Sequence, residues 1–157
     1  SDSTFAVVSF ARKSTLDIAL SPSTAALETI DSLEYRDGFT NTQAAIEQCR
    51  KELENAPTDH TTYLVLITDG LPTVNKANDR GHSCDSCIQQ AQDEANLSKA
   101  AGDTVITVGV LTGSFNPELL TDLASTPDLF FPVNDFNMLQ EKIKDVGKAA
   151  TICADDA

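Results

Sequence analysis

The segment YLVLITDG at residues 63–70 decides the fold class. Its five leading apolar residues are typical of a strand that is buried on both faces, as the strands of a parallel sheet are. The run ends in Asp69-Gly70, which places a carboxylate where the strand leaves the sheet. We therefore predict a buried parallel strand at residues 63–67, with Asp69 at its carboxyl end.

Short apolar strands alternate with helical stretches on both sides of this segment. We expect buried strands at residues 4–10, 63–67 and 104–111, an edge strand at 15–20 and a short last strand at 129–133. Helices should begin near residues 21, 40, 84, 116 and 135, and the last should carry Phe136, Leu139, Ile143 and Val146 along one stripe. Such alternation is typical of parallel strands joined by right-handed crossovers. It predicts an α/β fold: a three-layer, doubly wound, mostly parallel sheet with helices on both faces, in one domain over residues 1–157.

Local signals suggest where some helices begin and end. Ser21 would cap a helix whose first position is Pro22. Thr40 and Gln43 have the spacing of a capping box. Gly102 is well placed to end the helix that begins at residue 84.

The charge balance excludes some classes of partner. The chain has 157 residues, with 24 Asp and Glu against 11 Lys and Arg, and a formal net charge of -13. Binding to nucleic acid or to an anionic membrane requires clustered cations, which this sequence lacks. No apolar run approaches the roughly 18 residues of a membrane span, so we expect no membrane insertion. The first interpretation of the acidity is a solvated surface without a specific function. It also makes divalent cations and basic partners more plausible than anionic ones.

Two oxygen-bearing side chains are candidates for a cation site. In parallel sheets, ligands bind at the carboxyl ends of the strands, where Asp69 is expected. Thr40 opens the helix that precedes the same strand, so both residues can reach one rim. An all-oxygen site suits Mg²⁺ or Ca²⁺. The alternatives are that Asp69 caps a turn and that Thr40 is a helix cap.

Four blocks of sequence carry a family resemblance. They are FAVVSFA (5–11), GFTNTQAA (38–45), LVLITDG (64–70) and VITVGV (105–110). In this order and spacing, and with the last helix, they resemble the von Willebrand factor type A domain over residues 4–150. The resemblance implies a metal-ion-dependent adhesion site in which Thr40 and Asp69 are ligands. A partner's carboxylate commonly completes the shell of the ion in that family.

The chain departs from the family pattern at its beginning. The family's first strand, its Asp-x-Ser-x-Ser loop and its first helix are absent, and Asp2-Ser3-Thr4 cannot replace the loop because position 6 is Ala6. We expect a further strand between residues 4–10 and 63–68. It would come from another part of a longer polypeptide, or from a cleaved or donated segment. The remaining alternative is a sheet that is rearranged to do without it. Thr40 and Asp69 alone would hold Mg²⁺ or Ca²⁺ weakly.

The pair Cys84 and Cys87 has several interpretations. A disulfide, within the pair or to a distant cysteine, is the first. Free thiols are the second. A zinc site would add His82 and His60, and a thioredoxin-like redox pair would use the start of a helix. His60 is expected to be exposed.

The other cysteines and a glycosylation sequon bear on location. Cys49 lies on the apolar face of its helix, and Cys153 follows the last helix. In extracellular members of the family, a cysteine at the position of Cys153 often pairs with one ahead of the first strand. Asn96 begins an Asn-x-Ser sequon, which is used only in the secretory pathway. With the even number of cysteines, these features favour a secreted or cell-surface protein carrying disulfides.

The sequence leaves four functions to consider, of which two are favoured. The first is an extracellular adhesion module that binds a protein or glycoprotein, with or without a divalent ion. The second is a structural module of an extracellular matrix, wall or filament, with an incomplete metal site and neighbouring subunits as partners. An enzyme is not expected, since phosphate-binding loops and the G-x-S-x-G nucleophile elbow are missing. An intracellular chaperone-like or chelatase role conflicts with the cysteines and the sequon.

Overall fold

The computed structural model describes residues 3–75, 84–110, 116–135, 137, 138, 141, 142 and 144–146. The chain forms two compact units. The first consists of Ser1–His60 and Pro72–Glu94, and the second of Thr61–Leu71 and Ala95–Ala157. The single domain expected over residues 1–157 stays a prediction.

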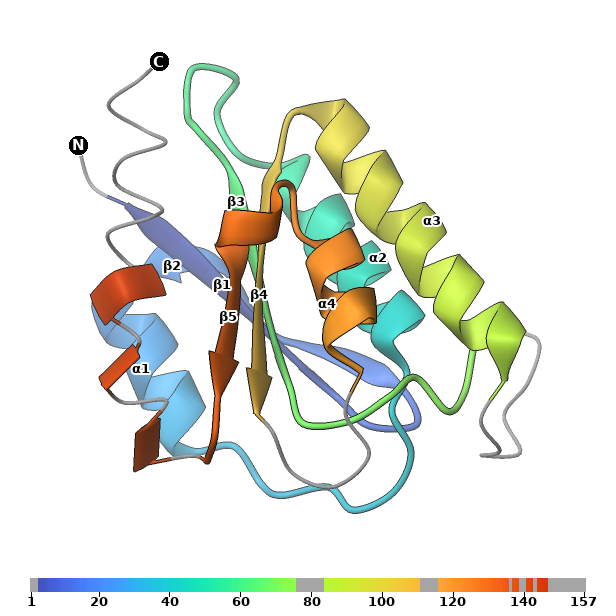
Figure 1. The fold of residues 1–157 in the computed structure, drawn as a ribbon. Coiled ribbons are helices and arrows are strands. Elements are labelled where there is room, and N and C mark those ends of the chain that lie inside the picture. The colour runs from blue at the N-terminus through green and yellow to red at the C-terminus, as the bar shows by residue number, and fades with distance from the viewer. Residues whose placement is uncertain are drawn as a thin grey trace. The chain divides into compact units, whose positions relative to one another are not determined.

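The first unit contains an antiparallel pair of strands and two helices (Figure 1). Strand β1 (Thr4–Phe10) pairs with β2 (Ser14–Pro22). Helices α1 (Ser23–Asp31) and α2 (Thr42–Leu53) each contact both strands. The two expected strands are confirmed, but the burial expected of β1 is wrong. Phe5 is 47% exposed, since β1 has one hydrogen-bonded neighbour among the described strands.

Both predicted helix caps in this unit are wrong by one residue. Ser21 and Pro22 belong to β2, because Pro22 is extended and pairs with Thr4 across the β1–β2 ladder. Pro22 therefore precedes α1 and provides no side-chain cap. At α2 the cap is Asn41, whose side-chain oxygen accepts the Ala44 N–H at 3.0 Å.

The second unit is built on a parallel sheet of order β3-β4-β5. Its strands are β3 (Tyr63–Thr68), β4 (Thr104–Val110) and β5 (Phe130–Val133). Helix α4 (Pro117–Leu123) packs against β4 and begins where the sequence predicts, with Asn116 as its cap. A short 3₁₀ helix, η1 (Pro127–Leu129), leads into β5. The α/β class with a parallel sheet is confirmed.

Strands β3 and β4 differ in burial. All of β4 from Val105 onward is buried, and Ile106, Val108 and Val110 form the centre of an apolar core. In β3 burial alternates: Leu64 and Leu66 are buried, while Val65 is 43% and Ile67 is 40% exposed. The expectation that β3 is buried on both faces is therefore wrong, because the face that carries Val65 and Ile67 is not fully covered by described residues.

Helix α3 (Asp85–Ala101) runs across the boundary between the two units. One face of it is a fully buried stripe of small side chains: Cys87, Ala91, Ala95 and Ser98. The helix ends at Gly102, whose φ of 99° is the left-handed conformation that glycine adopts at little cost. After it, the buried Asp103 carboxylate accepts the hydroxyls of Ser98 and Thr62, each at 2.5 Å.

The expected last helix falls only partly within the described residues. Residues 137, 138, 141, 142 and 144–146 are helical, and Asp135 caps the start by accepting the Met138 N–H at 2.9 Å. Val146 is buried in the core of the second unit. The other residues of the apolar stripe expected on this helix, Phe136, Leu139 and Ile143, lie outside the described residues.

Candidate functional site

Asp69 lies directly after β3, at the carboxyl end of a parallel strand. Its residue is exposed. The preceding hydroxyl, on Thr68, lies 3.4 Å from the backbone nitrogen and carbonyl oxygen of Gly70. This short turn directs the chain out of the sheet, so the Asp69 carboxylate is placed at the rim where parallel sheets bind ligands.

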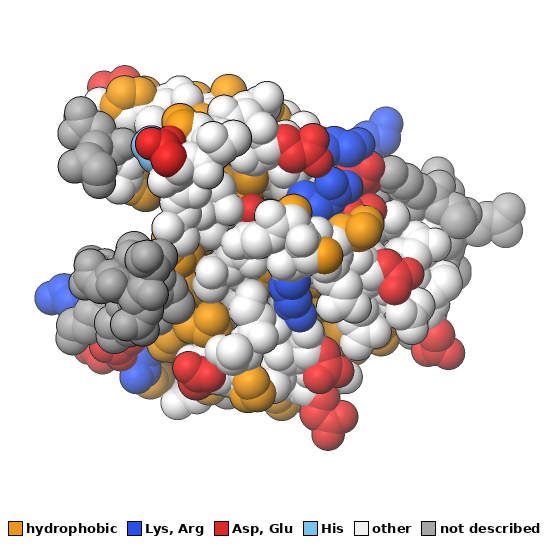
Figure 2. All heavy atoms as spheres, turned by 90° about the horizontal axis from the view of Figure 1, so that it is seen from above, with side chains coloured by type: hydrophobic (Ala, Val, Ile, Leu, Met, Phe, Trp, Pro, Cys, Tyr) orange, Lys and Arg blue, Asp and Glu red, His pale blue; other side chains and the backbone are white. Residues whose placement is uncertain are grey.

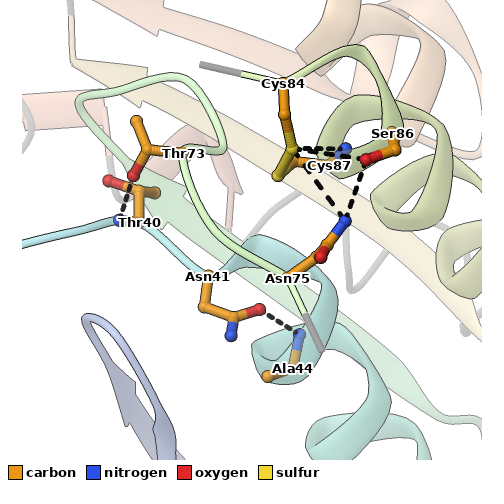
Figure 3. The surroundings of a disulfide bond; sticks show 8 residues. All are labelled: Thr40, Asn41, Ala44, Thr73, Asn75, Cys84, Ser86 and Cys87. Carbon is orange, nitrogen blue, oxygen red and sulfur yellow. Dashed lines mark hydrogen bonds between the residues drawn. A yellow bond between two sulfur atoms is a disulfide. The ribbon is translucent and has the colours of Figure 1, made fainter. Parts of the chain in front are cut away.

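Thr40 is fixed by hydrogen bonds from its backbone. Its N–H donates to the Thr73 hydroxyl at 2.8 Å (Figure 3). Its carbonyl accepts the N–H of Thr73 at 2.9 Å and of Val74 at 3.4 Å. Thr40 itself is half-buried. Because its N–H and its carbonyl are both hydrogen-bonded, the backbone of Thr40 is held in place just before α2.

The next residue, Asn41, anchors this segment to the turn after β1. Its N–H donates to the Ala11 carbonyl at 2.9 Å, and its side-chain amide donates to the Arg12 carbonyl at 3.0 Å. The Arg12 guanidinium also lies 4.1 Å from the centre of the Phe39 ring, a cation–π distance. Residues 39–41 are therefore tied to the loop that follows β1.

A hydroxyl and a carboxylate are the oxygen donors that Mg²⁺ and Ca²⁺ prefer. The chemistry of Thr40 and Asp69 therefore fits a hard divalent cation. The fit is partial, since the described residues contain no group of three or more His, Cys, Asp or Glu that could hold a metal. Thr40 belongs to the first unit and Asp69 to the second, so their joint binding of one ion stays a prediction.

Cys84 and Cys87 form a disulfide at the start of α3. Of the interpretations left open by the sequence, the structure shows the disulfide, in which both sulfurs are used and neither is free to ligate zinc. His82, the other proposed zinc ligand, lies outside the described residues. His60, which a zinc site would also need, is exposed as expected.

The remaining candidates lie apart from this disulfide. Cys49 is a free thiol on α2, and burial raises its pKa from the ordinary 9.0 to about 11. Cys153 is outside the described residues. Asn96 is exposed on α3, while Ser98 of the same sequon is fully buried.

Sequence reasoning missed three residues that organise these sites. Asn41 caps α2, and an asparagine one residue before a helix was a readable signal. Thr73 holds Thr40, and the buried Asn75 side chain donates to Ser86 beside the disulfide. These two contacts join segments distant in sequence, so no local pattern could have revealed them.

The surface agrees with the charge balance of the sequence. Acidic side chains are spread over the face seen in Figure 2, and the Lys and Arg side chains there stand in small groups. None of the helices in the described part of the chain has the length and apolar character that a membrane span requires.

The sequence matches the model of a known protein family. A sequence model of the von Willebrand factor type A domain matches residues 1–145. No curated protein sequence matches at a significant level.

Solved structures share the fold. Proximal thread matrix protein 1 from the mussel byssus, with a zinc-occupied MIDAS motif, is 26% identical over 96% of this chain and 36% of that one, with a TM-score of 0.74. The vWF domain of the pilus tip protein Mfa5 from Porphyromonas gingivalis is 15% identical over 95% and 80%, with a TM-score of 0.81. Manganese-loaded TRAP protein of Plasmodium vivax is 19% identical over 92% and 57%, with a TM-score of 0.67.

The chain spans about a third of the length of the mussel protein. The family match covers most of the present sequence, including the segments that contain Thr40 and Asp69. The parallel sheet and the placement of Asp69 after β3 agree with it. The chain belongs to the von Willebrand factor type A domain family.

Proposed function

We propose that this chain is an extracellular protein-binding module that holds protein or glycoprotein partners with the help of a divalent cation. Thr40 and Asp69 would supply two oxygen ligands, and water and a carboxylate of the partner would supply others. The chain would act by binding and not as an enzyme. The observation that carries the proposal is the exposed Asp69 carboxylate at the carboxyl end of β3 in a type A domain.

The surroundings of Thr40 support this proposal. A ligand whose backbone is already fixed loses little freedom when it binds an ion, which favours binding. Thr40 has this property through its bonds to residues 73 and 74. Among the solved structures with this fold, one has a zinc-occupied MIDAS motif and another is loaded with manganese. Both are compatible with a divalent ion here.

A titration of the chain with Mn²⁺ alone, followed by calorimetry, tests the cation step. Two oxygen ligands from the protein predict weak binding, with a dissociation constant on the order of 1 mM, at the weak end of carboxylate sites. Asp69→Asn, which keeps the side chain's shape and removes its charge, should reduce binding at least about tenfold. Thr40→Ala should weaken binding, and Thr40→Ser should retain it.

Asp59→Asn is the matched control, since Asp59 is also an exposed aspartate on a loop. It changes the net charge by the same amount, so it reports any binding that follows overall acidity. Equal losses of Mn²⁺ affinity in Asp69→Asn and Asp59→Asn would contradict cation binding at Asp69.

One observation favours a second candidate, a structural module completed by another segment or subunit. In the described sheet β3 is bonded to β4 alone, and it exposes Val65 and Ile67. A strand that pairs on one side only among the described strands, with exposed apolar side chains, offers an edge for strand addition. A neighbouring subunit of a matrix, wall or filament could provide that strand.

Sedimentation of the chain over a range of concentrations tests whether a second copy is the donor. Donation predicts self-association that the double variant Val65→Lys, Ile67→Lys abolishes. Both side chains are substantially exposed, so the variant should still fold. A chain that stays monomeric at every concentration would rule out donation by a second copy.

The extracellular setting is part of the proposal. A disulfide is expected in an oxidising compartment, and Asn96 is exposed where a glycan would attach. Secretion from a eukaryotic cell line should yield a chain that loses mass on enzymatic deglycosylation, and Asn96→Gln should remove that difference. A secreted chain of unmodified mass would contradict the glycan at Asn96.

A further inference from the structure

The two sulfurs of the Cys84–Cys87 disulfide have different access to solvent. Cys84 directly precedes α3 and is half-buried, whereas Cys87 in the first turn is completely buried. A thiol from outside can therefore attack the disulfide at Cys84, with Cys87 as the leaving group. An inert structural cross-link has no need of such asymmetry, but thiol–disulfide exchange depends on which sulfur is attacked.

Three hydrogen-bond donors surround the Cys84 sulfur (Figure 3). The Cys87 N–H lies 3.1 Å from it, the Ser86 hydroxyl 3.4 Å and the Asn75 side-chain amide 3.9 Å. A disulfide sulfur is a weak acceptor, but a thiolate is a strong one. The arrangement is therefore more favourable for Cys84 as a thiolate, after reduction, than for Cys84 in the disulfide.

The buried Asn75 side chain holds this arrangement of donors in place. Its residue is 2% exposed, and its amide also donates to the Ser86 oxygen at 3.2 Å. That bond occupies the lone-pair side of the Ser86 hydroxyl, which leaves its proton for the Cys84 sulfur. The start of α3 adds its dipole in the same direction. The exposed Asp85 carboxylate, next in sequence to Cys84, opposes a thiolate, but it is solvated.

We propose that Cys84 and Cys87 form a redox-active disulfide that oxidises the dithiol of a partner protein, with Cys84 as the exchanging sulfur. Stabilisation of the Cys84 thiolate lowers the free energy of the reduced pair and makes the disulfide a better oxidant. This activity is separate from the cation-dependent binding proposed above.

The exchange balances in two steps. A partner thiolate attacks the Cys84 sulfur, the Cys84–Cys87 bond breaks, a partner–Cys84 disulfide forms, and the Cys87 thiolate takes up a proton. The partner's second thiolate then attacks the partner sulfur of that bond and releases the Cys84 thiolate. The partner loses two electrons and two protons; the pair gains both electrons and one proton, and the second proton passes to solvent.

Alkylation of the reduced chain with iodoacetamide, followed by peptide mass spectrometry across a pH series, tests the proposal. Cys84 should react at least about tenfold faster than Cys87 at pH 7, and its reaction should reach half of its maximal rate at a lower pH than the reaction of Cys49. Cys49 in the same sample is an internal reference for a half-buried thiol without this arrangement of donors. Ser86→Ala should slow Cys84 about two- to threefold at pH 7, while Gln89→Ala, an exposed change in the next turn of α3, should not.

Equilibration with glutathione tests the exchange itself. Cys87→Ser should trap a mixed disulfide of Cys84 with glutathione, and Cys84→Ser should form far less because Cys87 is buried. Three results would show a structural cross-link and overturn the proposal: equal reactivity of the two cysteines, half-maximal reaction of Cys84 at or above the pH found for Cys49, or unfolding of the chain on reduction. These results are independent of Mn²⁺ binding.

Discussion

The two faces of β3 should respond differently to the loss of side-chain carbons. Leu66 is 4% exposed and Val65, its neighbour on the opposite face, is 43% exposed. Leu66→Ala removes three buried carbons and leaves a cavity, which costs about 2–5 kcal/mol. Val65→Ala removes two carbons that are partly in water already. At about 0.8 kcal/mol per buried carbon, the expected loss is about 1 kcal/mol or less.

Urea unfolding followed by circular dichroism gives both free energies of unfolding. Both variants place an alanine in the same strand, so the β-propensity of the new residue is the same in each. The difference between their free energies of unfolding therefore reflects mainly the burial of the side chain that was removed. The difference between the variants should be at least about 1 kcal/mol. A Val65→Ala loss as large as that of Leu66→Ala would show that the Val65 face is covered in solution, which would refute the exposure described here.

Three further changes test local contacts. Asn41→Ala should destabilise the chain by about 1–2 kcal/mol in urea unfolding, since it removes a helix cap and a tie to the loop after β1, whereas Asn41→Asp should retain the cap. Asp103→Ala should cost about 2–3 kcal/mol, because it leaves two hydroxyl groups without their acceptor; a loss below 0.5 kcal/mol would contradict the role given to this carboxylate. Burial raises the pKa of the Cys49 thiol in the folded state from 9.0 to about 11. The thiol's contribution to the free energy of unfolding is therefore complete below pH 9 and is lost as the pH rises from 9 to 11. Cys49→Ala should remove that part of the pH dependence, and an unchanged profile would contradict it.

Much of the fold was predictable because its strands and helices are locally encoded. Apolar runs gave β3, β4 and β5, and Gly102 and Asn116 marked a helix end and a helix start. The caps of α1 and α2 were wrong because pairing across β1–β2 keeps Pro22 extended and because Asn41, not Thr40, faces the helix. Tertiary contacts overrode plausible local signals in both places.

The candidate site was predictable in its residue types but not in its supports. The position of Asp69 after an apolar strand indicated a carboxylate at the rim, and the structure places it there. The burial of β3 was misjudged because a run of apolar residues does not reveal which face is covered. Thr73 and Asn75 could not be foreseen, since they contact Thr40 and the disulfide across long sequence separations.

Thr40 and Asp69 are proposed above to bind one divalent ion. Paramagnetic broadening of backbone amide NMR signals by small amounts of Mn²⁺ tests it most directly, because broadening falls steeply with distance from the ion. The amides of residues 39–41 and of 68–70 should broaden together, at the same Mn²⁺ concentration, and Asp69→Asn should remove both effects. Broadening of one segment without the other, or broadening scattered over the acidic surface and unchanged in Asp69→Asn, would contradict it.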